Sequence, residues 1–179
     1  MPQIQAVSET ALYVADVARS ARFYEDVLGF RRLSGDDRFC GLRVASEQVL
    51  ILFRKGGSVK PVNTPGGVIP PHDGDGQLHI AFSIPPADFD AWQARLREKG
   101  ITIESVVNWE GGLRSLYFRD PDNHLIELAT PGLWKTDVGE SPVEEVFGRL
   151  KHAGSPKSVG DMKKAIARGV RDRHSRGRY

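Results

Sequence analysis

Two kinds of hydrophobic periodicity alternate along the first part of the chain. Apolar and polar residues alternate over positions 9–14, which predicts a strand with one apolar face. Over positions 17–28 the apolar residues recur at helical spacing, with Asp16 placed to cap the start of the helix and Gly29 to end it. Short strands are predicted at about 30–34, 38–45 and 48–54. Residues 6–55 are therefore predicted to form a βαβββ module.

The same order of elements returns in a second module, residues 78–134. Its first strand is predicted at 79–84, and an amphipathic helix at 86–99 is stopped by Gly100. Three strands follow at 101–107, 114–119 and 124–129. Between the last two, Asp120-Pro-Asp-Asn123 places proline and aspartate where a tight hairpin turn needs them. The two modules match element for element.

Residues 56–77 join the modules and are rich in glycine and proline. This composition excludes a packed element and indicates a surface loop, which we expect to be a lid able to fold over a site. His72 lies in this linker, where a histidine can serve as a catalytic acid or base near neutral pH. The alternative is an ordinary loop histidine that faces solvent.

Composition limits the location and the partners of the protein. Residues 1–134 hold 14 Lys and Arg against 17 Asp and Glu, a net charge of −3, whereas residues 135–179 hold 11 against 6, a net charge of +5. The basic character lies in the tail, so no nucleic acid is expected as a partner of the domain. We find no membrane-spanning run and no signal peptide, and expect a cytoplasmic protein. The single Cys40 excludes an internal disulfide and is expected to be a small buried side chain.

Three side chains of metal-ligand type occupy matched places in the repeat. Glu9 and His79 open the first strand of each module, and Glu127 lies on the last strand of the second. Two carboxylates and one imidazole predict a divalent metal ion, Mn, Fe, Zn or Mg. Each residue also has an ordinary explanation, because Glu9 could be solvated and His79 could be a hydrogen-bonded core histidine. A structural Glu127 would need Arg114 or Arg119 as a partner for its buried carboxylate.

Several short motifs together resemble a known superfamily over residues 6–134. They are Leu12-Tyr-Val-Ala-Asp16, Phe23-Tyr24, Val27-Leu-Gly-Phe30, His79-Ile-Ala-Phe82 and Tyr117-Phe-Arg-Asp-Pro-Asp-Asn-His-Leu-Ile-Glu127. The set resembles the vicinal oxygen chelate superfamily, which includes glyoxalase I, bleomycin-resistance proteins, extradiol dioxygenases and fosfomycin-resistance transferases. The resemblance implies an α+β fold in which two paired βαβββ modules form a curved mixed-sheet cup.

The resemblance also implies what the cup holds. Its metal ligands fall on Glu9, His79 and Glu127, whereas the fourth place falls on Ile51, which cannot bind a metal. A three-ligand set therefore matches, with glutamate where those relatives usually have histidine. Tyr117 occupies the place of a tyrosine near the substrate, where a phenol could donate to a developing oxyanion; a half-buried sheet tyrosine is the alternative. A homodimer is implied, with modules exchanged between chains as one arrangement.

The tail, residues 135–179, has helical spacing in two short segments and a basic end, which predicts a short C-terminal extension that is helical or partly disordered. Val146-Phe-Gly-Arg-Leu-Lys151 and Ser158-Val-Gly-Asp-Met162 resemble the toxin-binding segment of AbrB-type antitoxins. This resemblance implies a protein partner for the tail.

Three functional interpretations follow. The first is a metal-dependent enzyme that chelates a small oxygen-rich substrate and acts as an isomerase, a dioxygenase or a thiol transferase. The second is a metal-free protein of bleomycin-resistance type that sequesters a small molecule. The third is an interaction protein that acts through its basic tail.

Overall fold

In the computed structural model, the chain divides into two units, Met1–Lys135 and Thr136–Tyr179. The structure describes residues 1–134. The predicted helical extension over residues 135–179 and its predicted protein partner lie outside the described residues.

The first module has the predicted βαβββ order. It consists of β1 (Glu9–Val14), α1 (Val17–Leu28), β2 (Arg31–Gly35), β3 (Phe39–Ala45) and β4 (Gln48–Arg54). The strands form one sheet in the order β1-β4-β3-β2, with β1 parallel to β4 and the other pairs antiparallel. Both predicted helix ends are confirmed. The Asp16 carboxylate accepts from the Arg19 N–H, and Gly29 ends α1 at a φ of 75°, which favours glycine.

The second module repeats this architecture. It consists of β7 (His79–Ser83), α2 (Phe89–Glu98), β8 (Ile103–Asn108), β9 (Arg114–Arg119) and β10 (Leu125–Ala129), with short 3-10 turns at Pro86–Asp88 and Glu110–Gly112. The strand order β7-β10-β9-β8 is equivalent to that of the first sheet. The predicted fold class of paired βαβββ modules is therefore confirmed.

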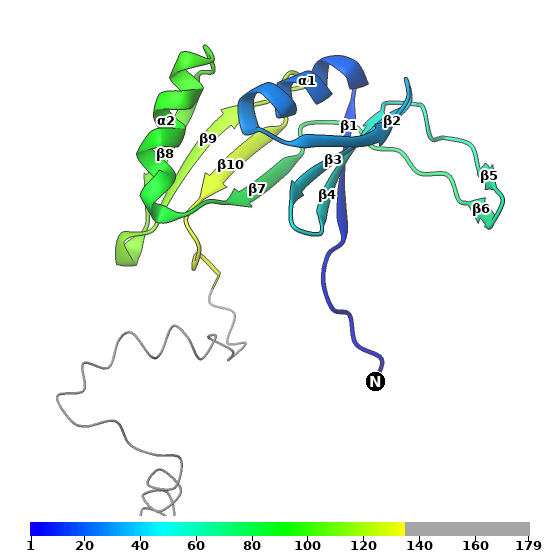
Figure 1. Ribbon diagram of the computed structural model, residues 1–179, viewed down its shortest axis with the longest axis horizontal. Coiled ribbons are helices and arrows are strands. Elements are labelled where there is room, and N and C mark those ends of the chain that lie inside the picture. The colour runs from blue at the N-terminus through cyan, green and yellow to red at the C-terminus, as the bar shows by residue number, and fades with distance from the viewer. Residues whose placement is uncertain (135–179) are drawn as a thin grey trace, which may run out of the picture. The chain divides into compact units, whose positions relative to one another are not determined.

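The linker contains two strands that the sequence did not predict. Strands β5 (Val62–Thr64) and β6 (Gly67–Ile69) form an antiparallel hairpin around Pro65-Gly66, with the Thr64 hydroxyl donating to the Gly67 carbonyl. The hairpin is almost wholly exposed, so it does not extend either core. Figure 1 shows it projecting beyond the first module. Its role as a lid stays a prediction.

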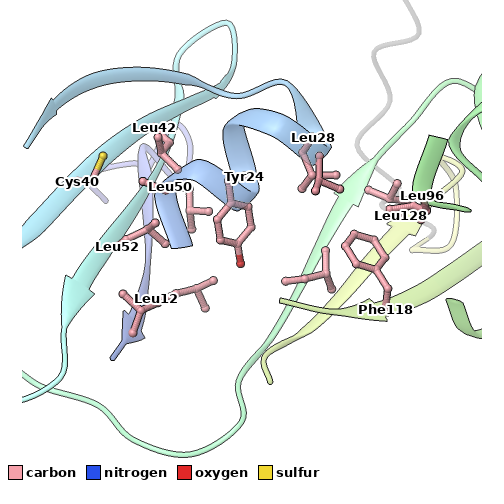
Figure 2. Close-up of a cluster of buried hydrophobic side chains, with 14 of the residues drawn as sticks. Leu12, Tyr24, Leu28, Cys40, Leu42, Leu50, Leu52, Leu96, Phe118 and Leu128 are labelled. Atoms are coloured by element: carbon pink, nitrogen blue, oxygen red, sulfur yellow. The ribbon is translucent and has the colours of Figure 1, made fainter. Parts of the chain in front are cut away.

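One hydrophobic core serves both modules. Alternate residues of each sheet face this core, and they include Leu12, Leu42, Leu52, Phe118 and Leu128. Figure 2 shows these side chains on both sides of α1. Each fully buried leucine contributes about 1.5 to 3 kcal/mol relative to exposure. The remaining alternate residues form what we call the open face of each sheet, the face turned away from the core.

Cys40 belongs to this core, and its burial raises the pKa of the thiol, in agreement with a packing side chain.

None of the helices within residues 1–134 combines the length and the apolar character needed to cross a membrane.

The β9–β10 turn joins the second module to the first. The Tyr24 hydroxyl of α1 donates to the Asp120 carboxylate over 2.9 Å. The Asp122 carboxylate accepts from the Ala15 N–H at 2.7 Å and from the Ser20 hydroxyl at 2.8 Å. The turn therefore holds α1 both at its start and in its second half through charged acceptors.

His124 completes this contact with both of its ring nitrogens. The Leu78 N–H donates to Nδ1 over 3.0 Å, so Nδ1 carries no proton. The proton therefore lies on Nε2, which is 3.0 Å from the Tyr13 carbonyl and donates to it. The ring is fully buried and bonds the backbone of both modules. Its role is to orient one module on the other.

Candidate metal centre

Two of the three predicted ligands lie together on the open face of the second sheet. The parallel strands β7 and β10 place His79 opposite Leu125 and Ala81 opposite Glu127. His79 Nε2 consequently lies 3.3 Å from Glu127 Oε2. The side chain of Glu127 is 9% exposed and that of His79 is 48% exposed, so the pair is accessible from the histidine side.

The tautomer of His79 follows from its other nitrogen. Nδ1 lies 3.1 Å from the Leu125 carbonyl oxygen, which can only accept, so Nδ1 carries a proton. In a neutral ring, Nε2 then directs a lone pair toward a carboxylate oxygen. This contact is favourable only when a proton or a metal ion lies between the two atoms. A histidine that donates its other N–H to a carbonyl is typical of a metal ligand.

Tyr117 orients the carboxylate rather than standing free. Its hydroxyl donates to Glu127 Oε1 over 2.9 Å, across the β9–β10 pair. Burial is the main cause that raises the pKa of Tyr117, and the hydrogen bond to Glu127 raises it further, whereas the Ser115 hydroxyl acts in the opposite direction. The Trp109 indole N–H in turn donates to Ser115. Tyr117 therefore contacts the predicted site through Glu127, whose carboxylate it orients.

The two arginines that could have neutralised Glu127 are engaged elsewhere. Arg114 pairs with Asp90 at 3.1 Å and lies over the Phe89 ring. Arg119 pairs with Glu104 at 3.2 Å. Neither arginine is a partner of the buried carboxylate, whose side-chain contacts are with Tyr117 and His79.

Glu9 lies apart from this pair, in the other sheet. It occupies the place in β1 that His79 has in β7, exposed on the open face, and the place equivalent to Glu127 is held by Ile51. Within residues 1–134, no three His, Cys, Asp or Glu side chains converge as metal ligands do. A cavity of about 270 Å³ adjoins Glu9, and its lining includes Val49 of β4 and Ala81 of β7. A single chain therefore brings together two of the three predicted ligands.

His72 lies at the first sheet, away from the His79–Glu127 pair. Its Nδ1 is 2.8 Å from the Tyr13 hydroxyl, and its ring meets Phe53 edge-on at 4.6 Å between centroids. Burial, followed by the nearby Asp73 carboxylate, raises the pKa of Tyr13. Tyr13 lies on the same open face of β1 as Glu9. Tyr13 was not among the residues predicted from the sequence. The alternation of the strand places it on the same face as Ala11, and no other feature of the sequence points to it.

The donor set at His79 and Glu127 fits a divalent metal ion. Two atoms 3.3 Å apart can both lie within the 2.0 to 2.2 Å, roughly, that Zn and similar ions require of nitrogen and oxygen ligands. One imidazole and one carboxylate leave further coordination positions for another ligand and for a substrate.

Known proteins are similar to this chain in sequence and in architecture. Residues 6–128 match the family model of the Glyoxalase/Bleomycin resistance protein/Dioxygenase superfamily. The glutathione transferase FosA of Serratia marcescens is 27% identical over 125 residues, which cover 70% of this chain and 80% of FosA. The metallothiol transferase FosB of Staphylococcus epidermidis is 30% identical over 129 residues, which cover 72% of this chain and 83% of FosB.

Among solved structures, lactoylglutathione lyase from Agrobacterium tumefaciens has a TM-score of 0.67 and 31% sequence identity, and the match covers 75% of this chain and 99% of that chain. The paired modules of the fold agree with these matches. The chain belongs to the glyoxalase, bleomycin resistance protein and dioxygenase superfamily.

Proposed function

We propose that this protein is a metal-dependent enzyme that acts on a small oxygen-rich substrate. The metal ion is held by His79 and Glu127 of one chain and by Glu9 of a second copy. The observation that carries the proposal is the lone pair of His79 Nε2 opposite Glu127 Oε2 at 3.3 Å, while Nδ1 is held by a carbonyl. A divalent ion bound there would be held by both side chains and would offset the charge of the Glu127 carboxylate.

A second copy supplies what one chain lacks. The helix-facing sides of both sheets share one core, so their open faces are turned away from it. Glu9 lies on the open face of the first sheet, and the His79–Glu127 pair lies on the open face of the second. If the first module of one copy faces the second module of the other, a two-fold dimer forms two complete three-ligand sites.

The residues around the ion support chelation chemistry. When bound, the ion supplies a Lewis acid that stabilises negative charge developing on a substrate oxygen. Tyr117 fixes the orientation of the Glu127 carboxylate through its 2.9 Å hydrogen bond. In the assembled dimer, His72 with Tyr13 lies on the Glu9 side of the site, where it can take up or return a proton.

Two observations bear on the type of reaction. Relatives named as glutathione and metallothiol transferases and as a lactoylglutathione lyase favour chemistry on a thiol or a thiol adduct. The two carboxylate ligands place more negative charge on the ion than a set of two histidines and one glutamate would, which disfavours ferrous dioxygen chemistry. We therefore rank thiol transfer and isomerisation above ring cleavage.

Metal binding tests the proposal directly. We expect wild-type protein, stripped with chelator and titrated with Mn²⁺ or Zn²⁺ in a calorimeter, to bind about one ion per chain. Removing the ligand in Glu127→Gln lowers that affinity by at least about 100-fold. Glu104→Gln, on a carboxylate paired with Arg119, is the matched control and retains full affinity. Wild-type protein that binds neither ion, or an unchanged Glu127→Gln, overturns the proposal.

A metal-free sequestering protein is the second candidate. It is favoured by the partly buried aromatic cluster of Tyr13, Phe39, Phe53 and His72 on one open face, which could contact a flat ligand. In that case the 3.3 Å contact of His79 with Glu127 is a salt bridge of a protonated histidine. The same titration separates the two candidates, because a salt bridge needs no ion.

A further inference from the structure

A row of side chains crosses the open face of the first sheet. The register places Glu9 beside Val49, Val49 beside Arg43, and Arg43 beside Arg31. In-register partners on adjacent strands point to the same side of a sheet. Leu42, next to Arg43, is fully buried in the core, so the row lies on the opposite, open side. Glu9 and the two arginines therefore share one surface.

The two arginines form an unusual pair. Arg31 and Arg43 are directly opposite each other on antiparallel strands, where like charges destabilise a sheet. Four other arginines of the module lie within 3.4 Å of a carboxylate; these are Arg19, Arg32, Arg38 and Arg54. Arg31 and Arg43 make no such contact with any of residues 1–134.

We infer that Arg31 and Arg43 bind an anionic group, a carboxylate or a phosphate, of the substrate whose neighbouring oxygens reach the metal centre. Two guanidinium groups on one surface offer paired N–H donors that match the oxygens of such an anion. The bound anion removes the repulsion between the arginines. The assignment of the metal-binding end rests on the proposed function, whereas the anion subsite stands on the arginine pair itself.

The sheet geometry sets the size of this substrate. Adjacent strands are about 4.8 Å apart, so Arg43, two strands from Glu9, lies about 10 Å from it along the row. The intervening Val49 is short, and Gly41, which precedes Arg43 by two places on the same face, has no side chain to obstruct the surface. A Cβ added at Gly41 would meet nothing closer than 3.8 Å. The row therefore suits an extended small molecule with oxygens at one end and an anion several bonds away.

Binding of simple anions to metal-free protein tests the subsite. We expect inorganic phosphate or succinate to bind chelator-treated wild-type protein in a calorimetric titration at low ionic strength. Arg43→Gln and Arg31→Gln each weaken that binding about tenfold, because each removes a charged donor. Arg22→Gln, which removes an exposed arginine of α1, changes the net charge equally and leaves binding unchanged. A tighter response to phosphate or to succinate identifies which anion the pair prefers.

The inference is overturned if neither anion binds the wild type, or if Arg22→Gln weakens binding as much as Arg43→Gln does. A separate metal titration keeps its failure distinct from that of the proposed function. Arg43→Gln is expected to bind Mn²⁺ like the wild type, since it is not a ligand. If wild-type protein binds phosphate through Arg43 but no metal, the proposed function fails and the anion subsite stands.

Discussion

Two tyrosine hydroxyls each donate to a carboxylate, and they serve different ends. Tyr117 donates to Glu127 on an open face, whereas Tyr24 donates to Asp120 inside the shared core. Burial and the Asp120 carboxylate raise the pKa of Tyr24 well above its usual value, so this hydroxyl stays protonated as a donor. Losing either hydroxyl removes one hydrogen bond. We expect the loss to affect metal affinity at Tyr117 and the stability of the fold at Tyr24.

We predict that Tyr117→Phe weakens metal binding about 10- to 100-fold, because Glu127 loses the partner that orients it. The free energy of unfolding should change by no more than about 1.5 kcal/mol. Calorimetric metal titration and urea unfolding measure the two effects. Metal affinity equal to the wild type would show that Tyr117 has no part in positioning Glu127.

We predict the reverse pattern for Tyr24→Phe. It leaves a buried acceptor of Asp120 without its donor and should lower the free energy of unfolding by about 1 to 3 kcal/mol. Metal affinity per folded chain should be unchanged, since Tyr24 contacts no predicted ligand. A variant with normal stability and weakened metal binding would contradict this division of roles.

Among the elements, the β9–β10 turn makes contacts with the first module whose contribution to stability depends on pH. Burial acts to raise the pKa of Asp122, but the hydrogen bonds from Ala15, Ser20 and Arg19 outweigh it and lower that pKa below the usual value. A carboxyl group with a lowered folded-state pKa stabilises the fold above its unfolded pKa of about 3.9 and loses that contribution as pH falls through the folded value.

We therefore predict that Asp122→Asn lowers the free energy of unfolding by about 1 to 3 kcal/mol at pH 7. The difference from the wild type should begin to shrink below about pH 4 and vanish at more acidic pH. Denaturant unfolding across pH measures it. Asp37→Asn, at an exposed pair with Arg54, should change stability by less than about 1 kcal/mol. A difference that persists undiminished at pH 2 would refute this account.

The base of the linker depends on a glycine. A Cβ at Gly74 would lie 2.5 Å from the Tyr13 ring, which is held by His72 and stacks with Phe53. We predict that Gly74→Ala displaces the linker, at a cost of about 1 to 3 kcal/mol, and speeds proteolytic cleavage within residues 56–77. Gly66→Ala is the control, because its added carbon meets only Thr64 Oγ1 at 4.0 Å. Equal cleavage of both variants would contradict the prediction.

Most of the correctly predicted elements have one buried face, which periodicity reports directly. Strand β2 is the exception, because it was predicted although it is exposed along its length. Glu9 and His79 hold equivalent places in the two sheets, and so do Ile51 and Glu127, in agreement with the repeat. The β5–β6 hairpin was not predicted, because its strands are short and exposed and show no periodic pattern, although Pro65-Gly66 is a turn signal.

Contacts between distant residues could not be predicted from the sequence. Tyr13 and His72 are 59 positions apart, and His124 lies 111 positions from the same tyrosine. A periodic pattern states which face of an element is buried and names no partner for it. For the same reason the sequence could group Glu9 with His79 and Glu127 as predicted ligands, but not state how the two modules hold them in space.

At the scale of the whole molecule, we predict that two defective variants restore each other. Glu9→Gln and Glu127→Gln should each lose metal affinity as homodimers. In a mixed dimer, one site carries both changes and the other is intact, so a refolded equimolar mixture should recover about a quarter of the wild-type sites. Metal analysis of the mixture measures this fraction. Recovery of no sites, with heterodimers verified by mass spectrometry, would show that the ligands come from one chain.

The two modules share one core, and His124 bonds the backbone of both, so the position of one module on the other is fixed. In the proposed dimer, each chain contributes Glu9 to one metal centre and His79 with Glu127 to the other. We therefore expect metal binding per chain to fall with dilution below the dissociation constant of the proposed dimer. In that arrangement the concentration of the protein would itself set the fraction of complete sites.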